Sequence, residues 1–168
     1  MSLSMQASST AVFARALANL KHVLERGEAW AKEHNVSDGV LLGTRLIPDM
    51  FPLLKQVQIA CDTAARSAAR LANVEPKPFP DEEATLADVQ ARLDATIAYV
   101  ESFTAGQLEG AEARTISVPR RSGKIELNGS DYLYHYALPN FFFHCTTAYA
   151  LLRAAGVQIG KNDFLGQL

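Results

Sequence analysis

The sequence predicts an all-α protein, a helical bundle with a short β-hairpin between its third and fourth helices. Apolar residues recur at steps of three and four in four long stretches, which is the spacing of one helix face. A proline-rich segment separates the second stretch from the third. Two short runs of alternating apolar and polar residues, 115–118 and 124–127, are typical of paired strands.

The first helix is predicted from Ser8 to Glu33. Its charged residues lie mostly off a single apolar stripe, as expected for a helix with one buried face. That stripe consists of Phe13, Ala16, Leu17, Leu20, Val23, Leu24, Gly27 and Ala31. The triplet 37–39 (Ser-Asp-Gly) is typical of a turn or cap before a short apolar piece, Val40 to Leu42.

The second helix is predicted to open at 47–49 (Ile-Pro-Asp). Proline suits a first turn, and an acidic residue favours the positive end of the helix dipole. Pro52 makes that first turn irregular. Small residues between 60 and 69 are expected to let another helix approach closely. The predicted core face is Met50, Phe51, Leu54, Val57, Cys61, Ala65, Ala68 and Leu71.

The segment 73–80 has prolines at 76, 78 and 80 and is predicted to be extended. Thr85 and Asp88 resemble a capping box, from which a third helix is expected to run to about Phe103. The hairpin follows, with its turn at 119–123. Because a two-stranded hairpin is marginal alone, it is expected to lean on the bundle.

The fourth helix is predicted from about Pro139 to Ala155, with Gly156 as a left-handed stop. The tail, 157–168, keeps apolar residues, including Ile159, Phe164 and Leu165, and is therefore expected to pack back on the bundle.

Length and composition narrow the class of protein. A chain of 168 residues is expected to form a single domain over 1–168. The formal charge of −2 gives no basic stripe and argues against nucleic-acid binding, and Arg120, Arg121 and Lys124 are interpreted as a solvated hairpin tip. No apolar stretch approaches the about 18 residues of a membrane span, and residues 1–10, which lack a basic start and an apolar core, are not expected to act as a secretory signal. Cys61 and Cys145 fall in apolar helical patterns and are expected to be reduced core residues of a cytoplasmic protein.

Two polar residues interrupt the apolar fourth helix. Asn140 and His144 are one turn apart and share a face. A buried imidazole needs partners, so this pair is either a satisfied part of the core or one side of a pocket.

The second helix offers partners for that pair. Gln58 lies on its apolar face and Asp62 borders it, whereas Gln56 is expected to project to the opposite, more exposed side. A buried glutamine needs several hydrogen bonds, so Gln58 is a candidate partner of the helix-four pair or a core amide bonded elsewhere. His135 precedes the fourth helix and is a weaker candidate for the mouth of a pocket.

Over nearly its full length, the chain resembles a family of uncharacterised bacterial proteins within the DinB/YfiT-like superfamily. The resemblance is carried by four stretches, 41–53, 56–60, 138–144 and 156–166. It implies a four-helix bundle of up-down-down-up arrangement, often a homodimer.

Many members of that superfamily bind a divalent metal through a histidine on helix two and an HxxxH pair on helix four. The resemblance places that pair at Asn140 and His144, and Gln58, or less well Gln56, near the helix-two position. Zinc and nickel prefer imidazole and thiolate over neutral amides, so only His144 is left as a metal ligand and no cofactor is expected.

Three hypotheses about function follow. The first is a bundle whose degenerate metal pocket around Gln58, Asn140 and His144 binds a small molecule or is purely structural. The second is a zinc- or nickel-dependent thiol transferase or hydrolase, with His144 as ligand or base and Asp62 or His135 completing the site. The third is a homodimeric interaction protein that associates through apolar residues of helix four, namely Phe142, Phe143 and Tyr149.

Overall fold

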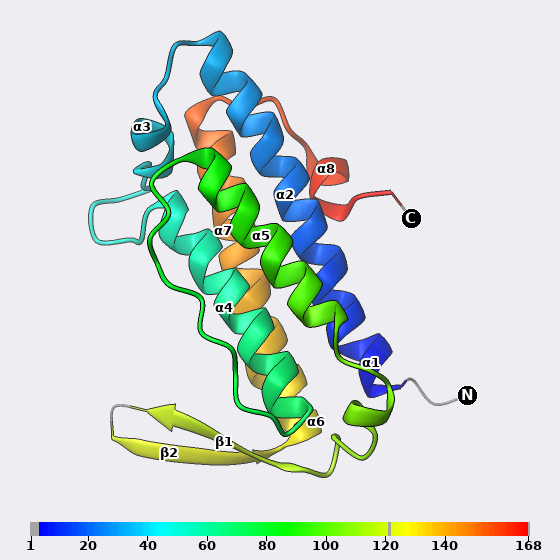
Figure 1. The fold of residues 1–168 in the computed structure, drawn as a ribbon. Coiled ribbons are helices and arrows are strands. Elements are labelled where there is room, and N and C mark those ends of the chain that lie inside the picture. The colour runs from blue at the N-terminus through cyan, green and yellow to red at the C-terminus, as the bar shows by residue number, and fades with distance from the viewer. Residues whose placement is uncertain (1–3, 121, 168) are drawn as a thin grey trace.

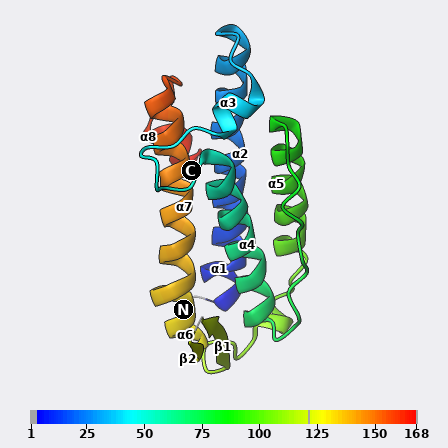
Figure 2. The same ribbon diagram turned by 90° about the vertical axis from the view of Figure 1, so that its left-hand side faces the viewer.

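The computed structural model describes residues 4–120 and 122–167, and four long helices dominate this part of the chain (Figures 1 and 2). They are α2 (Thr10–Glu33), α4 (Leu53–Leu71), α5 (Leu86–Glu101) and α7 (Leu138–Ala155). Helices α2 and α7 run in one direction and α4 and α5 in the other, so the arrangement is up-down-down-up (Figure 1). Helix α4 packs against α5 and α7, and α2 packs against the same two helices. The predicted all-α bundle with one hairpin is confirmed.

The first helix follows the prediction closely. A short helix, α1 (Met5–Ser8), precedes α2, and the chain bends between them at Ser9. Six residues of the predicted stripe are at most 3% exposed and face the interior, namely Phe13, Leu17, Leu20, Val23, Leu24 and Ala31. The predicted short apolar piece lies in α3 (Asp38–Leu42).

The start of the second helix was predicted wrongly. Helix α4 begins at Leu53, with Pro52 as its N-cap, rather than at Ile47. Proline disfavours helical geometry at the preceding residue, so the helix does not extend through Phe51. Residues 43–52 form a loop instead, and Phe51 is 54% exposed rather than part of the core.

The middle of α4 carries the small residues that allow close packing on two sides. These residues are at most 1% exposed, and they are Ala60, Ala64, Ala65, Ala68 and Ala69. Because alanine side chains are short, the backbones of α5 and α7 approach α4 closely. The two buried thiols, Cys61 and Cys145, are free, as predicted.

An extended strap, residues 72–85, connects the end of α4 to the start of α5 and returns along the bundle (Figure 1). The predicted capping box at the start of α5 is present. The Thr85 hydroxyl accepts from the Asp88 backbone N–H at 3.1 Å, and the Asp88 carboxylate accepts from the Thr85 backbone N–H at 2.8 Å. The strap is therefore fixed where it enters α5.

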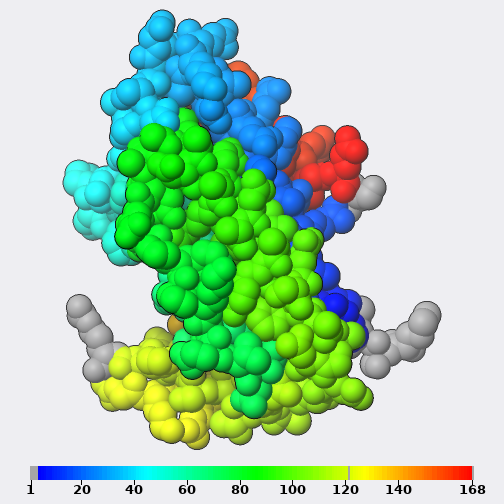
Figure 3. Space-filling view, in the orientation of Figure 1, coloured from blue at the N-terminus to red at the C-terminus, as the bar shows by residue number. Residues whose placement is uncertain are grey.

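The predicted hairpin is formed by β1 (Thr115–Arg120) and β2 (Gly123–Asn128). The strands are antiparallel, with Val118 opposite Ile125. Ile116 and Val118 are buried, whereas most of β2 is exposed, so β1 carries the contact with the bundle. In the space-filling view the hairpin lies along the lower edge of the molecule (Figure 3). Pairing continues to Arg120 and Gly123, which makes the turn shorter than predicted; Arg121 lies outside the described residues.

The fourth helical region begins earlier than predicted. A single turn, α6 (Gly129–Asp131), leads into wide π-helical turns, η2 (Tyr132–Ala137), which continue directly into α7. This region therefore starts ten residues before Pro139 (139 minus 129). Tyr132, the first residue of these π-helical turns, is fully buried.

The C-terminal tail packs back on the bundle, as predicted. Gly156 has a φ of 109° and ends α7 in the left-handed conformation. The tail contains α8 (Lys161–Leu165), which contacts α2, and the rings of Tyr149 and Phe164 meet edge to face with centroids 5.7 Å apart. Among the described residues, no helix combines the length and apolar character needed to cross a membrane.

Candidate ligand-binding site

His144 is buried on α7 and bonded to a glutamine of α4. Its Nδ1 lies 2.7 Å from Oε1 of Gln56, whose amide nitrogen donates to the carbonyl of Phe51 at 3.1 Å. Since Gln56 uses its nitrogen on Phe51, its oxygen accepts and His144 Nδ1 carries the proton. Burial lowers the pKa of His144 from its ordinary value, which favours the neutral ring.

The partner of His144 is therefore Gln56, and Gln58 follows the other alternative left open for it, an amide bonded elsewhere. Gln56 was expected to be exposed, yet it is only 2% exposed. Helix α4 is covered by α7 on one side and by the strap and α5 on another. Gln56 faces α7, whereas the Gln58 amide donates to Oε2 of Glu83 in the strap at 2.7 Å.

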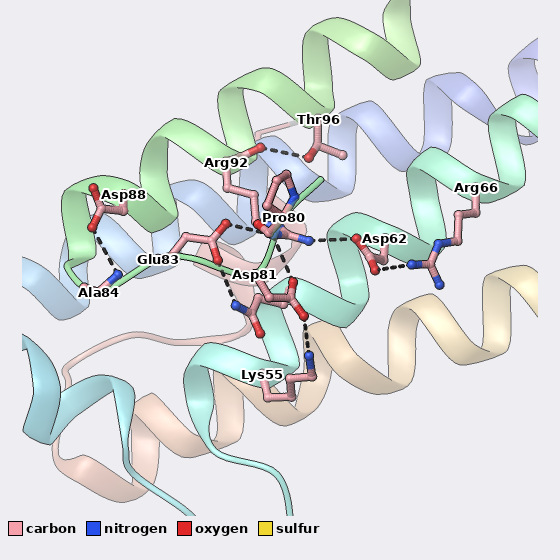
Figure 4. A network of polar contacts seen from close by, with 11 residues as sticks. Lys55, Asp62, Arg66, Pro80, Asp81, Glu83, Ala84, Asp88, Arg92 and Thr96 are labelled. Carbon is pink, nitrogen blue, oxygen red and sulfur yellow. Dashed lines mark hydrogen bonds and ion pairs between the residues drawn. The ribbon is translucent and has the colours of Figure 1, made fainter. Parts of the chain in front are cut away.

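Asp62 belongs to an ion-pair network around Arg92 of α5 (Figure 4), and Gln58 joins this network through its bond to Glu83. The Arg92 side chain is 3% exposed and donates to Asp62 and to Glu83, each at 2.7 Å. It also donates to the carbonyl of Pro80 at 2.9 Å and lies 3.2 Å from Asp81. Three carboxylates and one carbonyl thus converge on one buried guanidinium, which joins α4, α5 and the strap.

Arg92 was not among the residues predicted from the sequence, although its position on the apolar face of α5 indicated that it is buried. Arg92 lies three residues after Val89 and four before Thr96, on the buried face of α5. A basic residue at core spacing needs buried acceptors, and three acidic residues occur close by in the strap, Asp81, Glu82 and Glu83.

The buried network favours the charged forms of its members. Burial acts to raise the pKa of Glu83, but hydrogen bonds from Arg92 and Gln58 hold it below its ordinary value. The hydrogen bond from Lys55 is the main cause that lowers the pKa of Asp81. Near this network, burial raises the pKa of the Cys61 thiol to about 12, so Cys61 is not a nucleophile at neutral pH.

Asn140 faces a different part of α4 from His144. Its amide nitrogen donates to the Thr63 hydroxyl at 3.0 Å. His135 was predicted at the mouth of a pocket, but its side chain is 77% exposed and lies 3.6 Å from Asp131. The five predicted site residues therefore do not form one cluster: Gln58 and Asp62 belong to the Arg92 network, whereas His144, Asn140 and His135 each have other partners.

A polar groove lies between α4 and the start of the fourth helical region, with β1 and the strap at its edges. Its volume is about 470 Å³, within the range of small-molecule sites. Of the predicted residues, Asp62 and Asn140 line it, whereas Gln58, His135 and His144 do not. The α4 wall carries Lys55, Asp62, Thr63, Arg66, Ser67 and Arg70, and Tyr132, Tyr136 and Asn140 form the opposite wall.

Comparison with known proteins gives the family. Residues 5–165 match the family model described as a domain of unknown function, DUF1993. The chain belongs to the DUF1993 family. It is also similar to the crystal structure of a DinB family member protein from Shewanella denitrificans, with 38% identity and a TM-score of 0.92. That match covers 98% of this chain and 93% of the other. No curated protein matches the chain significantly.

In this DUF1993 chain, Gln56 Oε1 and His144 Nδ1 do not hold a metal ion between them. Two ligands of one zinc ion each lie about 2.0–2.2 Å from it. Gln56 and His144 are instead bonded directly at 2.7 Å, which leaves no space for an ion between these two atoms. Asn140 turns its amide to Thr63. Among the described residues, no three side chains of His, Cys, Asp or Glu are grouped so that they could hold a metal.

Proposed function

We propose that this DUF1993 protein binds a small molecule in the groove between α4 and the start of the fourth helical region. The observation that carries the proposal is the convergence of polar side chains from α4, the strap and the η2–α7 region on one hollow of about 470 Å³. Grooves of this size with a few converging polar groups are the usual places for small ligands.

The contacts within the groove support this proposal. Asn140 and Thr63 bond to each other across it at 3.0 Å, and the buried hydroxyls of Ser67 and Tyr132 lie 2.9 Å apart. These bonds join the two walls, so the polar groups are held in place before a ligand arrives. Preorganised polar groups reduce the entropy that binding costs.

The test is a fragment screen by two-dimensional NMR on the full chain, with neutral, cationic and anionic fragments. The expected result is a set of amide shifts confined to groove residues such as Thr63, Ser67 and Asn140. Replacing Ile59 on the groove wall by tryptophan should abolish those shifts, whereas the matched change Val40→Trp on exposed α3 should not. Shifts elsewhere only, or no shifts at all, would overturn the proposal.

We also propose that the protein is a homodimer. Support comes from an apolar surface formed by the loop 43–52 and α7, where Ile47 is 53%, Phe51 54% and Phe143 57% exposed. A twofold axis through such a patch buries the same residues twice, which suits an isologous dimer. Of the helix-four residues predicted for this role, Phe142 and Tyr149 pack against the core, and only Phe143 is exposed.

Light scattering at micromolar concentration tests the homodimer. The wild-type chain is expected to have twice the mass of one chain, and Phe143→Ser is expected to shift it to the monomer. The matched change Val40→Ser, which also removes an exposed apolar side chain but lies on α3, should leave the mass unchanged. A monomeric wild type would contradict the proposal.

A further inference from the structure

We propose that the ligand of the groove carries an anionic group, a carboxylate or a phosphate, which Arg70 binds. This inference rests on the proposed function and names the chemical class of its ligand. Its basis is the set of charged side chains that line the groove and the partners that neutralise them.

Two of the basic side chains in the groove already have carboxylate partners. Lys55 pairs with Asp81 at 2.5 Å, and Arg66 pairs with Asp62 at 2.8 Å. Arg70 differs from both. Within residues 4–120 and 122–167, no carboxylate oxygen lies within 4.0 Å of its guanidinium, and Glu75, which lines the adjoining hollow, is also beyond that distance.

Arg70 is held in position without being neutralised. Its Nη1 donates to the hydroxyl of Tyr132 at 3.2 Å, and that hydroxyl lies 2.9 Å from Oγ of Ser67. Tyr132 is fully buried and Ser67 is 1% exposed, so this anchor is rigid. A guanidinium has five N–H donors, and the described residues use one of them. The remaining edge suits the two oxygens of a carboxylate or phosphate.

The position of Arg70 also fits this role. It lines both the groove and the adjoining hollow of about 460 Å³, which meet at Arg70 and Pro119. A second arginine lies near, because the guanidinium of Arg120 is 5.2 Å from the ring of Tyr136 on the groove wall. The groove is lined by three basic side chains and by two carboxylates, Asp62 and Asp81, whereas the chain as a whole carries a formal charge of −2.

The experiment titrates the full chain with inorganic phosphate and, separately, with malonate. Saturable shifts of the Arg70 Nε–H signal and of the Ser67 amide are expected with at least one probe. Arg70→Met should weaken that binding about tenfold or more, because a hydrogen-bonded ion pair is lost. Arg26→Met is the matched control, since Arg26 also donates to an uncharged oxygen, the carbonyl of Gln158, but lies on α2 outside the groove, and this change should leave anion binding nearly unaltered. Circular dichroism verifies that both variants fold.

The outcomes separate this inference from the proposed function. Equal affinity of wild type and Arg70→Met for both anions, or no anion binding by wild type, would overturn the inference. In those cases, neutral or cationic fragments that still shift groove residues would leave the proposed function standing. Binding of one anion but not the other, lost in Arg70→Met, would support the inference and narrow the class.

Discussion

At the scale of a single residue, the burial of Gln56 is not predicted by the hydrophobic periodicity of α4. A helical stripe identifies one buried face, and Gln58 lies on the stripe of α4 while Gln56 does not. Yet both are buried, because α7 covers one side of α4 and the strap covers another. Which neighbour covers which side depends on the packing of elements far apart in the sequence, so the partner of His144 was not readable from α4 alone.

The bond between Gln56 and His144 leads to a prediction about the pKa of His144. Gln56→Glu places a carboxylate beside Nδ1, and the pKa of His144 is expected to rise above its lowered wild-type value, because a negative neighbour favours the charged ring. Histidine ring shifts followed by NMR through a pH titration measure this. The wild-type chain, titrated under the same conditions, is the reference. An unchanged His144 pKa would show that residue 56 does not contact the ring.

At the scale of elements, features governed by local chemistry were predicted correctly. The Thr85–Asp88 capping box, the Gly156 stop and the alternating hairpin strands each depend on a few adjacent residues. The early start of the fourth helical region was missed, because wide π-helical turns do not follow a 3.6-residue period. The position of the strap was missed for another reason, since its partner, Arg92, lies on a different element.

Arg92 is expected to be essential for attaching the strap. Arg92→Met leaves the Glu83 carboxylate without its cation and leaves Asp62 with only the exposed Arg66, and unpairing a buried ion pair costs about 3–5 kcal/mol. Arg66→Met also removes a partner of Asp62, but the Arg66 side chain is 56% exposed, so a loss of about 1 kcal/mol or less is expected. Urea unfolding of the two variants measures the difference. Equal losses would mean that the network does not hold the strap.

Gly129 is predicted to be indispensable where the fourth helical region meets the turn at 108–114. A Cβ at this position would lie 1.8 Å from the carbonyl oxygen of Ala111, which is backbone and cannot rotate away. Gly129→Ala is therefore expected to cost about 1–3 kcal/mol or more. Gly106→Ala is the matched control, because nothing lies within 4 Å of its added methyl. Thermal unfolding compares the two, and a Gly129 variant as stable as the control would contradict the close contact.

The candidate site is a property of the whole molecule. Helix α4, the strap, β1 and the η2–α7 region each supply part of the groove. Sequence patterns indicated Asp62 and Asn140, because polar residues near an apolar face stand out. Arg70 and Tyr132 did not stand out, since an arginine near the end of a helix and a tyrosine before a helix are ordinary. The hydrogen bond from Arg70 to the Tyr132 hydroxyl forms only because α4 packs against η2, which the sequence of either element alone does not show.

The same arrangement predicts that acid destabilises the whole molecule in two separate pH ranges. The folded pKa of His144 lies below its ordinary 6.5, so the unfolded chain binds the proton first and stability falls as the pH drops below 6.5. The folded pKa of Glu83 lies below its ordinary 4.5, so its contribution is complete above 4.5 and is lost on further acidification. Free energies of unfolding from about pH 8 to about pH 3 should show both declines.

Two variants test whether His144 causes the upper decline in the free energy of unfolding and Glu83 the lower one. His144→Gln should remove the upper decline and leave the lower one. Arg92→Met should shrink the lower decline, because the effect of burial, which raises the pKa of Glu83, is then no longer opposed by the arginine. The part of the decline that remains belongs to other carboxyls with lowered pKa values, such as Asp88 and Asp163. If His144→Gln altered the lower decline as strongly as the upper one, the two sites would be coupled through α4 rather than independent. The measured profiles of the two variants therefore also test whether α4 transmits changes between its α7 side and its strap side.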